Sequence, residues 1–229
     1  MSIITLATSK GGAGKTTVAQ IILGSLAEQG YKVAALDADF NHTLSDWITQ
    51  VRKDSEFPIT VRHEIDETKI IPTVSSFIDN HDVIVIDTAG VATQATVFAI
   101  GCADLVLVPI KSSLQDVVEA LKTVNLVKSA SQMTKRSINV RVIFTDYQPR
   151  TNVAAHTESQ IRKYDLPMMS TKIEHLVGFK EMSYVGRVSN AGLPGLTVSQ
   201  LLDELREIGA IPFTPRQEKK IRIASRKTG

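Results

Sequence analysis

A glycine-rich loop near the start of the chain holds the residues best suited to chemistry. It runs Ser9, Lys10, Gly11, Gly12, Ala13, Gly14, Lys15, Thr16, Thr17. Its glycines let backbone N–H groups converge on phosphate oxygens. Lys15 can reach the β- and γ-phosphates of a triphosphate, the Thr16 hydroxyl can ligate Mg²⁺, and Thr17 is placed to bond the α-phosphate. Ser9 stands where the strict G-x-x-x-x-G-K-T pattern has glycine, but the remaining glycines, Lys15 and Thr16 can still bind phosphate and Mg²⁺. We predict a phosphate-binding loop rather than an incidental turn.

Lys10 is a second lysine, five residues before Lys15. It can bring another cation to the same triphosphate, or its side chain can point outward. Because Lys15 already serves its own subunit, an outward-facing Lys10 suggests help given to, or received from, a second subunit. The alternative is a solvated surface lysine.

Three acids follow apolar runs that are typical of buried strands. Asp37 and Asp39 end one run, and Asp87 ends another. A carboxylate at Asp87 would orient water on the Mg²⁺ that also carries Thr16. Asp37 either assists the magnesium or caps the following turn. The carboxyl ends of parallel strands share one edge of a sheet, so we expect these acids to lie beside the glycine-rich loop.

The rest of the chain alternates short apolar runs with helical periodicity. We expect strands at residues 3–8, 33–36, 59–62, 83–86, 105–110 and 140–145, with a weaker one at 168–173. We expect helices at residues 16–29, 44–52, 69–80, 92–102, 114–130, 151–163 and 196–208, and a loop at 186–195. This order predicts an α/β fold with a mostly parallel twisted sheet and helices on both faces.

Composition bounds the class of protein. The chain has 229 residues, 43% of them hydrophobic, and a net charge of +2. We expect one domain over residues 1–213, followed by a basic tail over 214–229. The single cysteine, Cys102, allows no disulfide within one chain. The sequence shows neither a secretion signal nor an apolar run of membrane-spanning length. A cytoplasmic location fits these features.

The segment KGGAGKTT resembles the deviant Walker A motif of the ParA/MinD family of P-loop ATPases. The family's D-x-D motif is matched by Asp37 and Asp39, and its apolar strand ending in D-T by Asp87 and Thr88. The resemblance implies a slow, Mg²⁺-dependent ATP hydrolase that forms a nucleotide-sandwich homodimer. It implies that Lys10 contacts the phosphates bound by the other subunit, and that Asp39 positions the attacking water.

The chain departs from the family at three places. Phe40 and Asn41 replace the usual Pro-Gln after the second acid, which leaves that loop less fixed. Ala89 and Gly90 follow Thr88 where many members have proline. The asparagine that often reads adenine is replaced by Thr145 and Asp146; either could read the adenine amino group, and we assign Asp146 to the nucleotide site.

The surface on which such a switch acts must come from other residues. The tail contains Arg216, Lys219, Lys220, Arg222, Arg226 and Lys227 against Glu218. Further cations are scattered at Arg136, Arg141, Arg150, Arg162, Lys163, Lys172, Lys180 and Arg187. Such charges can neutralise DNA phosphates without reading sequence, which would place the protein at the nucleoid. The alternative is a solvated tail. Ile221 and Ile223 are too close in sequence to form the apolar face of a membrane-binding helix.

The segment from Thr145 to Thr151 also resembles short ParA proteins and the VirC-type ATPases associated with conjugative and T-DNA transfer. We therefore expect a partition ATPase stimulated by a DNA-bound or cargo adaptor protein. The alternatives are a DNA-transfer ATPase, a cargo- or membrane-positioning ATPase and, more weakly, a metallocentre-assembly ATPase, which would need a cysteine pair.

Overall fold

The sheet organises the molecule and places the site. The computed structural model describes residues 1–91 and 93–215. Its strands are β1 Ser2–Leu6, β2 Val33–Ala38, β3 Thr60–His63, β4 Val83–Thr88, β5 Leu105–Ile110 and β6 Asn139–Phe144. They form one 6-stranded sheet in the order β3-β2-β4-β1-β5-β6, and every neighbouring pair is parallel. The predicted α/β architecture is confirmed.

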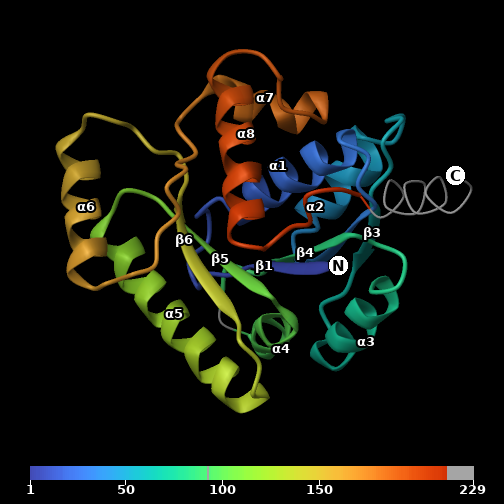
Figure 1. The fold of residues 1–229 in the computed structure, drawn as a ribbon, viewed down its shortest axis with the longest axis horizontal. Helices are drawn as coiled ribbons and strands as arrows, with labels where there is room; N and C mark the ends of the chain where they lie inside the picture. The colour runs from blue at the N-terminus through green and yellow to red at the C-terminus, as the bar shows by residue number, and fades with distance from the viewer. Residues whose placement is uncertain (92, 216–229) are drawn as a thin grey trace, which may run out of the picture.

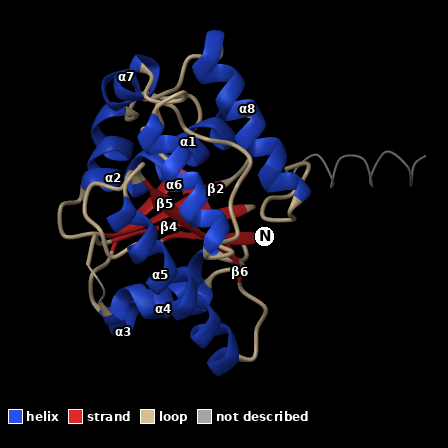
Figure 2. Ribbon diagram, turned by 90° about the vertical axis from the view of Figure 1, so that its left-hand side faces the viewer, coloured by secondary structure: helices blue, strands red, loops and turns tan. Residues whose placement is uncertain are grey.

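Helices cover both faces of this sheet (Figures 1 and 2). On one face lie α1 Lys15–Glu28, α2 Thr43–Asp46 with a π-helical turn at Trp47–Val51, α7 Val177–Val185 and α8 Gly192–Glu207. On the other lie α3 Glu67–Phe77, α4 Gln94–Cys102 and α5 Leu114–Thr134. Helix α6, Asn152–Lys163, packs beside α5. None of these helices is both long and apolar enough to cross a bilayer.

The strands are apolar on both sides because both faces are covered. Every residue of β2, β4 and β5 is buried. In β1, Ile4 and Leu6 join the core under α1 and α8, whereas Ile3 joins the core under α3 and α4. Because successive side chains of a strand point to opposite faces of the sheet, each strand contributes to two separate cores. This double burial fixes the position of the loops that leave each strand.

The strand register gathers the predicted acids at one edge. Asp87 pairs with Leu6 of β1 and with Asp37 of β2. The glycine-rich loop leaves β1 directly after Leu6, between the loops that follow β4 and β5. The expected convergence of these motifs at the carboxyl edge of the sheet is confirmed.

The predicted strand at residues 168–173 is wrong. The segment runs along β6, but it forms only the isolated bridges Val142↔Met168 and Tyr147↔Glu174. The backbone N–H groups of Ser170 and Thr171 donate to the carboxylate of Glu204 in α8, at 2.6 and 2.8 Å. These donors are withdrawn from β6, so no continuous ladder forms.

The predicted loop at residues 186–195 is only partly correct, because α8 already begins at Gly192. Pro194 falls in the first helical turn, where its missing N–H costs no hydrogen bond. Gly195 is required by packing, since a Cβ there would lie 2.3 Å from the carbonyl oxygen of Asn190. Gly192, Pro194 and Gly195 therefore lie in the first turn of a helix rather than in a loop.

Helix α7 was not predicted. Its nine residues are short for a helix that must stand on its own propensity. Tertiary contacts stabilise it: Phe179 and Met182 are buried, and Trp47 Nε1 donates to the carbonyl of Met182 at 3.0 Å. Of the predicted tail at 214–229, residues 216–229 lie outside the described residues.

Candidate functional site

The glycine-rich loop is shaped to present backbone donors. Gly12 and Gly14 have φ values of 72° and 91°, a region that side chains disfavour. Gly14 directly precedes α1, and no side chain caps that helix. The N–H groups of the first turn of a helix have no intrahelical partner, and the helix dipole adds positive potential there. The loop is therefore built to bind an anion.

Two neighbouring loops hold this backbone in place. Thr145, after β6, donates its hydroxyl to the carbonyl of Ala13 at 2.7 Å. Gly90, after β4, packs so closely that a Cβ there would lie 2.8 Å from Gly11 Cα. The hydroxyl of Thr145 is thus committed to bracing the loop, which leaves Asp146 as the side chain available to a ligand at this position.

Lys15 is a buried cation that a bound anion would stabilise. Its side chain is buried, at 6% exposure, and it forms no ion pair within residues 1–91 and 93–215. Burial lowers the pKa of its ammonium, while Asp87 and Asp39 act in the opposite direction. An unpaired buried cation is costly, and a phosphate would compensate it.

Asp87 and Thr16 form the arrangement expected for a metal site. Thr16 Oγ1 donates to Asp87 Oδ2 at 2.6 Å. The other oxygen, Oδ1, is buried and has no hydrogen-bond partner in the part of the chain that the structure describes. Burial raises the pKa of Asp87 to about 7, against the Thr16 hydrogen bond and with the help of Asp37. A hard divalent cation would favour the ionised carboxylate, so these two oxygen ligands fit Mg²⁺.

No cluster of three or more His, Cys, Asp or Glu side chains forms a metal site in the described part of the chain. A magnesium ion at Thr16 and Asp87 would therefore take its other ligands from phosphate and water.

Asp37 and Asp39 have different surroundings. Asp37 is completely buried and accepts the backbone N–H groups of Asp39 at 3.1 Å and Ser45 at 2.8 Å. Both of its oxygens are used in this way, which is the capping role considered for it. Asp39 is half-buried, and its Oδ1 accepts both the backbone and the side-chain N–H of Asn41, each at 2.9 Å.

Two open cavities meet at the loop. The first, of about 530 Å³, is lined by residues 11–17, by Asp39, Phe40 and Asn41, and by residues 89–91. The second, of about 510 Å³, shares Gly12, Gly14 and Thr17 with the first.

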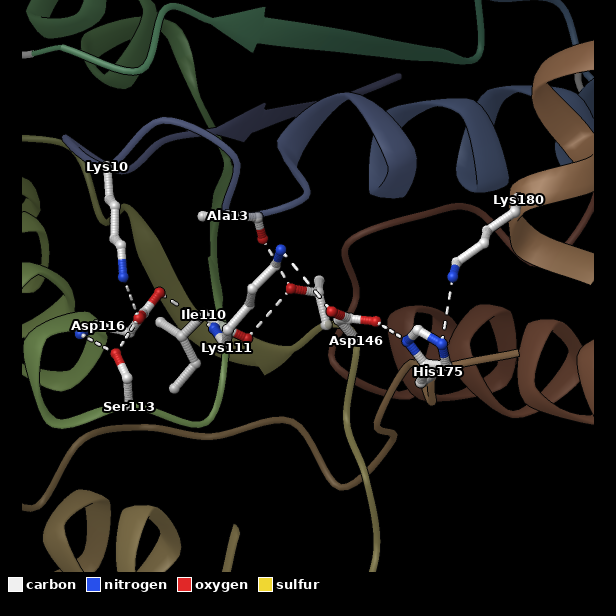
Figure 3. A network of polar contacts seen from close by, with 10 residues as sticks. Lys10, Ala13, Ile110, Lys111, Ser113, Asp116, Asp146, His175 and Lys180 are labelled. Atoms are coloured by element: carbon white, nitrogen blue, oxygen red, sulfur yellow. Dashed lines mark hydrogen bonds and ion pairs between the residues drawn. The ribbon is translucent and has the colours of Figure 1, made fainter. Parts of the chain in front are cut away.

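A chain of polar contacts lines the second cavity (Figure 3). The Asp146 carboxylate lies 3.7 Å from Lys111 Nζ and contacts His175 Nδ1. Lys180 Nζ lies 3.2 Å from His175 Nε2. Asp146 therefore projects into a cavity that is continuous with the loop.

Lys10 does not face either cavity. Its ammonium forms an ion pair with Asp116 at 2.5 Å, at the start of α5 (Figure 3). The sequence prediction of an outward-facing lysine did not include this partner. The signal for it was the S-x-x-D capping pattern of Ser113 and Asp116, which marks the first turn of a helix after β5.

Several of the cations considered for DNA are paired within the subunit. Arg136 pairs with Asp104 at 3.1 Å, while Arg162 and Lys172 share Glu158 at 3.6 and 2.5 Å. Arg150, Lys163 and Arg187 form no ion pair with the acids of residues 1–91 and 93–215. The basic tail residues from Arg216 onward lie outside the described residues.

Comparisons with known proteins agree with this geometry. The family model of the VirC1 protein matches residues 1–191. Protein ParA of Rhizobium radiobacter is 32% identical over 151 residues, which make up 65% of this chain and 66% of that protein. Maintenance of carboxysome distribution protein A of Halothiobacillus neapolitanus is 24% identical over 200 residues, 86% of this chain and 87% of that protein.

Solved structures with the same fold include an ATP complex of a variant of Cyanothece McdA, with a TM-score of 0.76 and 17% identity over 91% of this chain and 96% of that one. The cell division ATPase MinD of Pyrococcus furiosus has a TM-score of 0.73 and 18% identity over 90% of this chain and 99% of that one. With its glycine-rich loop, its strand order and its match to the family model over residues 1–191, this chain belongs to the VirC1 family of ParA/MinD-type P-loop ATPases.

Proposed function

We propose that this protein is a ParA-like ATPase switch. ATP and Mg²⁺ bind at the glycine-rich loop and favour a homodimer, and the dimer binds DNA without sequence preference. Slow hydrolysis, stimulated by an adaptor protein, returns the subunits to monomers. The main support for the proposal is the buried Lys15 at the start of α1, which has no ion-pair partner and whose helix has no side-chain cap among the described residues.

The two cavities suggest how the nucleotide lies. The phosphates occupy the first cavity, where the N–H groups of residues 11–17 surround them and Lys15 neutralises the β- and γ-phosphates. The nucleoside extends past Gly14 and Thr17 into the second cavity. There the Asp146 carboxylate accepts from the amino group of adenine.

Magnesium would be held by the Thr16 hydroxyl and, through water, by Asp87. When bound, it neutralises charge that develops on the phosphate oxygens. Asp39 lines the first cavity and would orient the attacking water. The remaining contribution of the protein is positioning and electrostatic stabilisation by Lys15 and by Lys10 of a second subunit, which accounts for slow turnover.

Membership of the VirC1 family favours a second candidate of the same mechanism, in which the switch serves conjugative DNA transfer rather than partition. Both candidates place a cytoplasmic protein beside plasmid or mobile DNA. They differ in phenotype: deletion of a partition ATPase increases the loss of its replicon from dividing cells, whereas deletion of a transfer ATPase lowers the frequency of conjugation.

The biochemical test combines light scattering after size exclusion with a DNA mobility shift, each with Mg²⁺ and either ATP or ADP. We expect a dimer and a shifted random-sequence duplex with ATP, and a monomer without a shift with ADP. Because the contacts are to phosphates, the shift should weaken steeply with salt. Equal and negligible shifts with both nucleotides, despite an ATP-dependent dimer, would favour cargo or membrane positioning over DNA.

Gly90→Ala should weaken ATP binding, because the added Cβ would lie 2.8 Å from Gly11 Cα and 3.0 Å from Gly11 N. Backbone cannot yield cheaply, so the phosphate-binding loop must shift. We expect a loss of affinity of about tenfold or more, since a displacement of about 1 Å costs on the order of a hundredfold in positioned sites.

The matched control is Gly101→Ala in α4, where the nearest side-chain atom to the added Cβ is 3.9 Å away. A titration with a fluorescent ATP analogue measures both variants. Unchanged affinity in Gly90→Ala would show that the loop does not need the packing seen here.

A further inference from the structure

The loop that carries Asp39 is tied to a neighbouring strand by a histidine. His63 is the last residue of β3, and it is paired in register with Asp37 of β2. Its Nε2 lies 3.1 Å from the backbone carbonyl oxygen of Asp39. Because a carbonyl oxygen can only accept, the ring of His63 carries a proton on Nε2 and donates it to Asp39.

Both polar groups of the Asp39 backbone are hydrogen-bonded. Its N–H donates to Asp37 Oδ1 at 3.1 Å, and its carbonyl oxygen also accepts the N–H of His42 at 3.2 Å. These two contacts are local, because each joins neighbouring parts of the same loop. The bond from His63 spans 24 residues. Among the hydrogen bonds of the described residues, it is the one that ties Asp39 to a strand other than its own.

The ring of His63 is itself held in place. The ring of His42 stacks on it, with centroids 3.6 Å apart and planes inclined by 30°. His42 adopts a left-handed conformation with a φ of 54°, directly before α2. The backbone N–H of Glu64, next to His63, donates to the carbonyl of Asp37 at 2.9 Å and anchors the end of β3. The position of the ring is therefore set by the sheet and by the stack.

The loop between β2 and α2 needs such a restraint from outside. Residues 39–42 contain no proline, which would stiffen the backbone, and Phe40 and Asn41 are exposed. The carboxylate of Asp39 accepts from Asn41, but Asn41 belongs to the same loop and would move with it. His63 therefore fixes the loop, and with it Asp39, relative to the sheet.

We propose that His63 is a positioning residue for ATP hydrolysis, which holds the backbone of Asp39 so that the Asp39 carboxylate meets the attacking water in the first cavity. The inference rests on the role of Asp39 in the proposed function. Nε2 of His63 contacts the backbone of Asp39, and His63 is not among the residues that line the first cavity. Loss of this contact should therefore slow hydrolysis and leave the affinity for ATP nearly unchanged.

The test compares two replacements of His63. His63→Phe keeps a planar ring to stack on His42 but has no donor, whereas His63→Gln places an amide N–H near the position of Nε2. At saturating MgATP we expect hydrolysis to slow about tenfold in His63→Phe, because a small displacement of a positioned group is costly. His63→Gln should stay close to the wild-type rate. Phosphate release measures the rate, and a titration with a fluorescent ATP analogue measures the affinity, which should hardly change in either variant.

His81→Phe is the matched control. Nε2 of His81 lies 2.9 Å from Thr60 Oγ1, at the first residue of β3, and its Nδ1 lies 3.0 Å from the carbonyl oxygen of Phe77. The variant also removes an imidazole contact to β3, but at the end of the strand away from Asp39. Its rate of hydrolysis should equal that of the wild type. An equal slowing in His81→Phe and His63→Phe would show that any loosening of β3 slows hydrolysis, and it would overturn a specific role of His63.

A double variant tests whether His63 acts through Asp39. If it does, His63→Phe has no further effect on the slow hydrolysis of Asp39→Ala, because both changes remove the same contribution. An additional loss in the double variant, a wild-type rate in His63→Phe, or a rate in His63→Gln no higher than in His63→Phe would each overturn the inference. If Asp39→Ala alone hydrolysed ATP at the wild-type rate, the role of Asp39 in the proposed function would fail, and the role of His63 with it.

Discussion

Lys15→Ala should abolish measurable ATP binding. In a titration with a fluorescent ATP analogue, we expect the affinity to fall by at least about a hundredfold. Lys15 is a buried cation that lines the first cavity, and it lies at the start of α1, where no acid of the described residues forms an ion pair with it. Charge-assisted hydrogen bonds contribute about 1.5–3 kcal/mol each, and this ammonium would make contacts to two phosphates. The N–H groups of the loop would remain, but they carry no full charge.

Loss of binding in this variant should occur without loss of the fold. Burial lowers the pKa of Lys15 and outweighs the attraction of Asp87 and Asp39. The charged side chain is therefore not a source of stability in the empty protein, and the free energy of unfolding should hardly change. Lys69→Ala, on the exposed side of α3, is the control for removing a lysine. Wild-type affinity in Lys15→Ala would refute the site.

The sheet and the loop could be predicted from sequence because their signals are local. The buried strands are continuous apolar runs, and the acids at the ends of two of them placed Asp37 and Asp87 at one edge. The register that pairs Asp37 with Asp87 follows from the parallel order. The chemical roles assigned to Lys15, Thr16 and Asp39 remain predictions, now supported by the burial of Lys15 and by the cavity that all three line.

Features that depend on contacts between residues far apart in the chain could not be predicted from the sequence. Helix α7 is stabilised by the contact of Trp47 with Met182, 135 residues apart, which no local pattern records. The segment at 168–173 has strand-like composition, but Glu204 in α8 takes two of its donors. The partner of Lys10 likewise follows from the way α5 packs beside the loop. In each case a tertiary contact overrides local propensity.

Asp39→Ala should separate binding from hydrolysis. Asp39 lines the first cavity from outside the loop, and its carboxylate contacts only Asn41 among the described hydrogen bonds. Its removal takes a negative charge from a cavity that receives a triphosphate, so ATP affinity should be kept or slightly raised. Hydrolysis should fall by about a hundredfold or more, the contribution of a positioned general base or water-orienting group. Because ATP persists, the dimer should accumulate.

Asp39→Asn decides what the carboxylate does. The amide oxygen can still accept from the N–H groups of Asn41, so a residue that only shapes the loop would leave hydrolysis near wild type in this variant. If Asp39 orients water through its charge, Asp39→Asn is as slow as Asp39→Ala. Asp46→Ala, on the exposed side of α2, controls for the loss of a nearby acid. Phosphate release and light scattering measure both steps. Monomers alone in the presence of ATP, with the nucleotide bound, would count against a sandwich in which trapped ATP holds two subunits together.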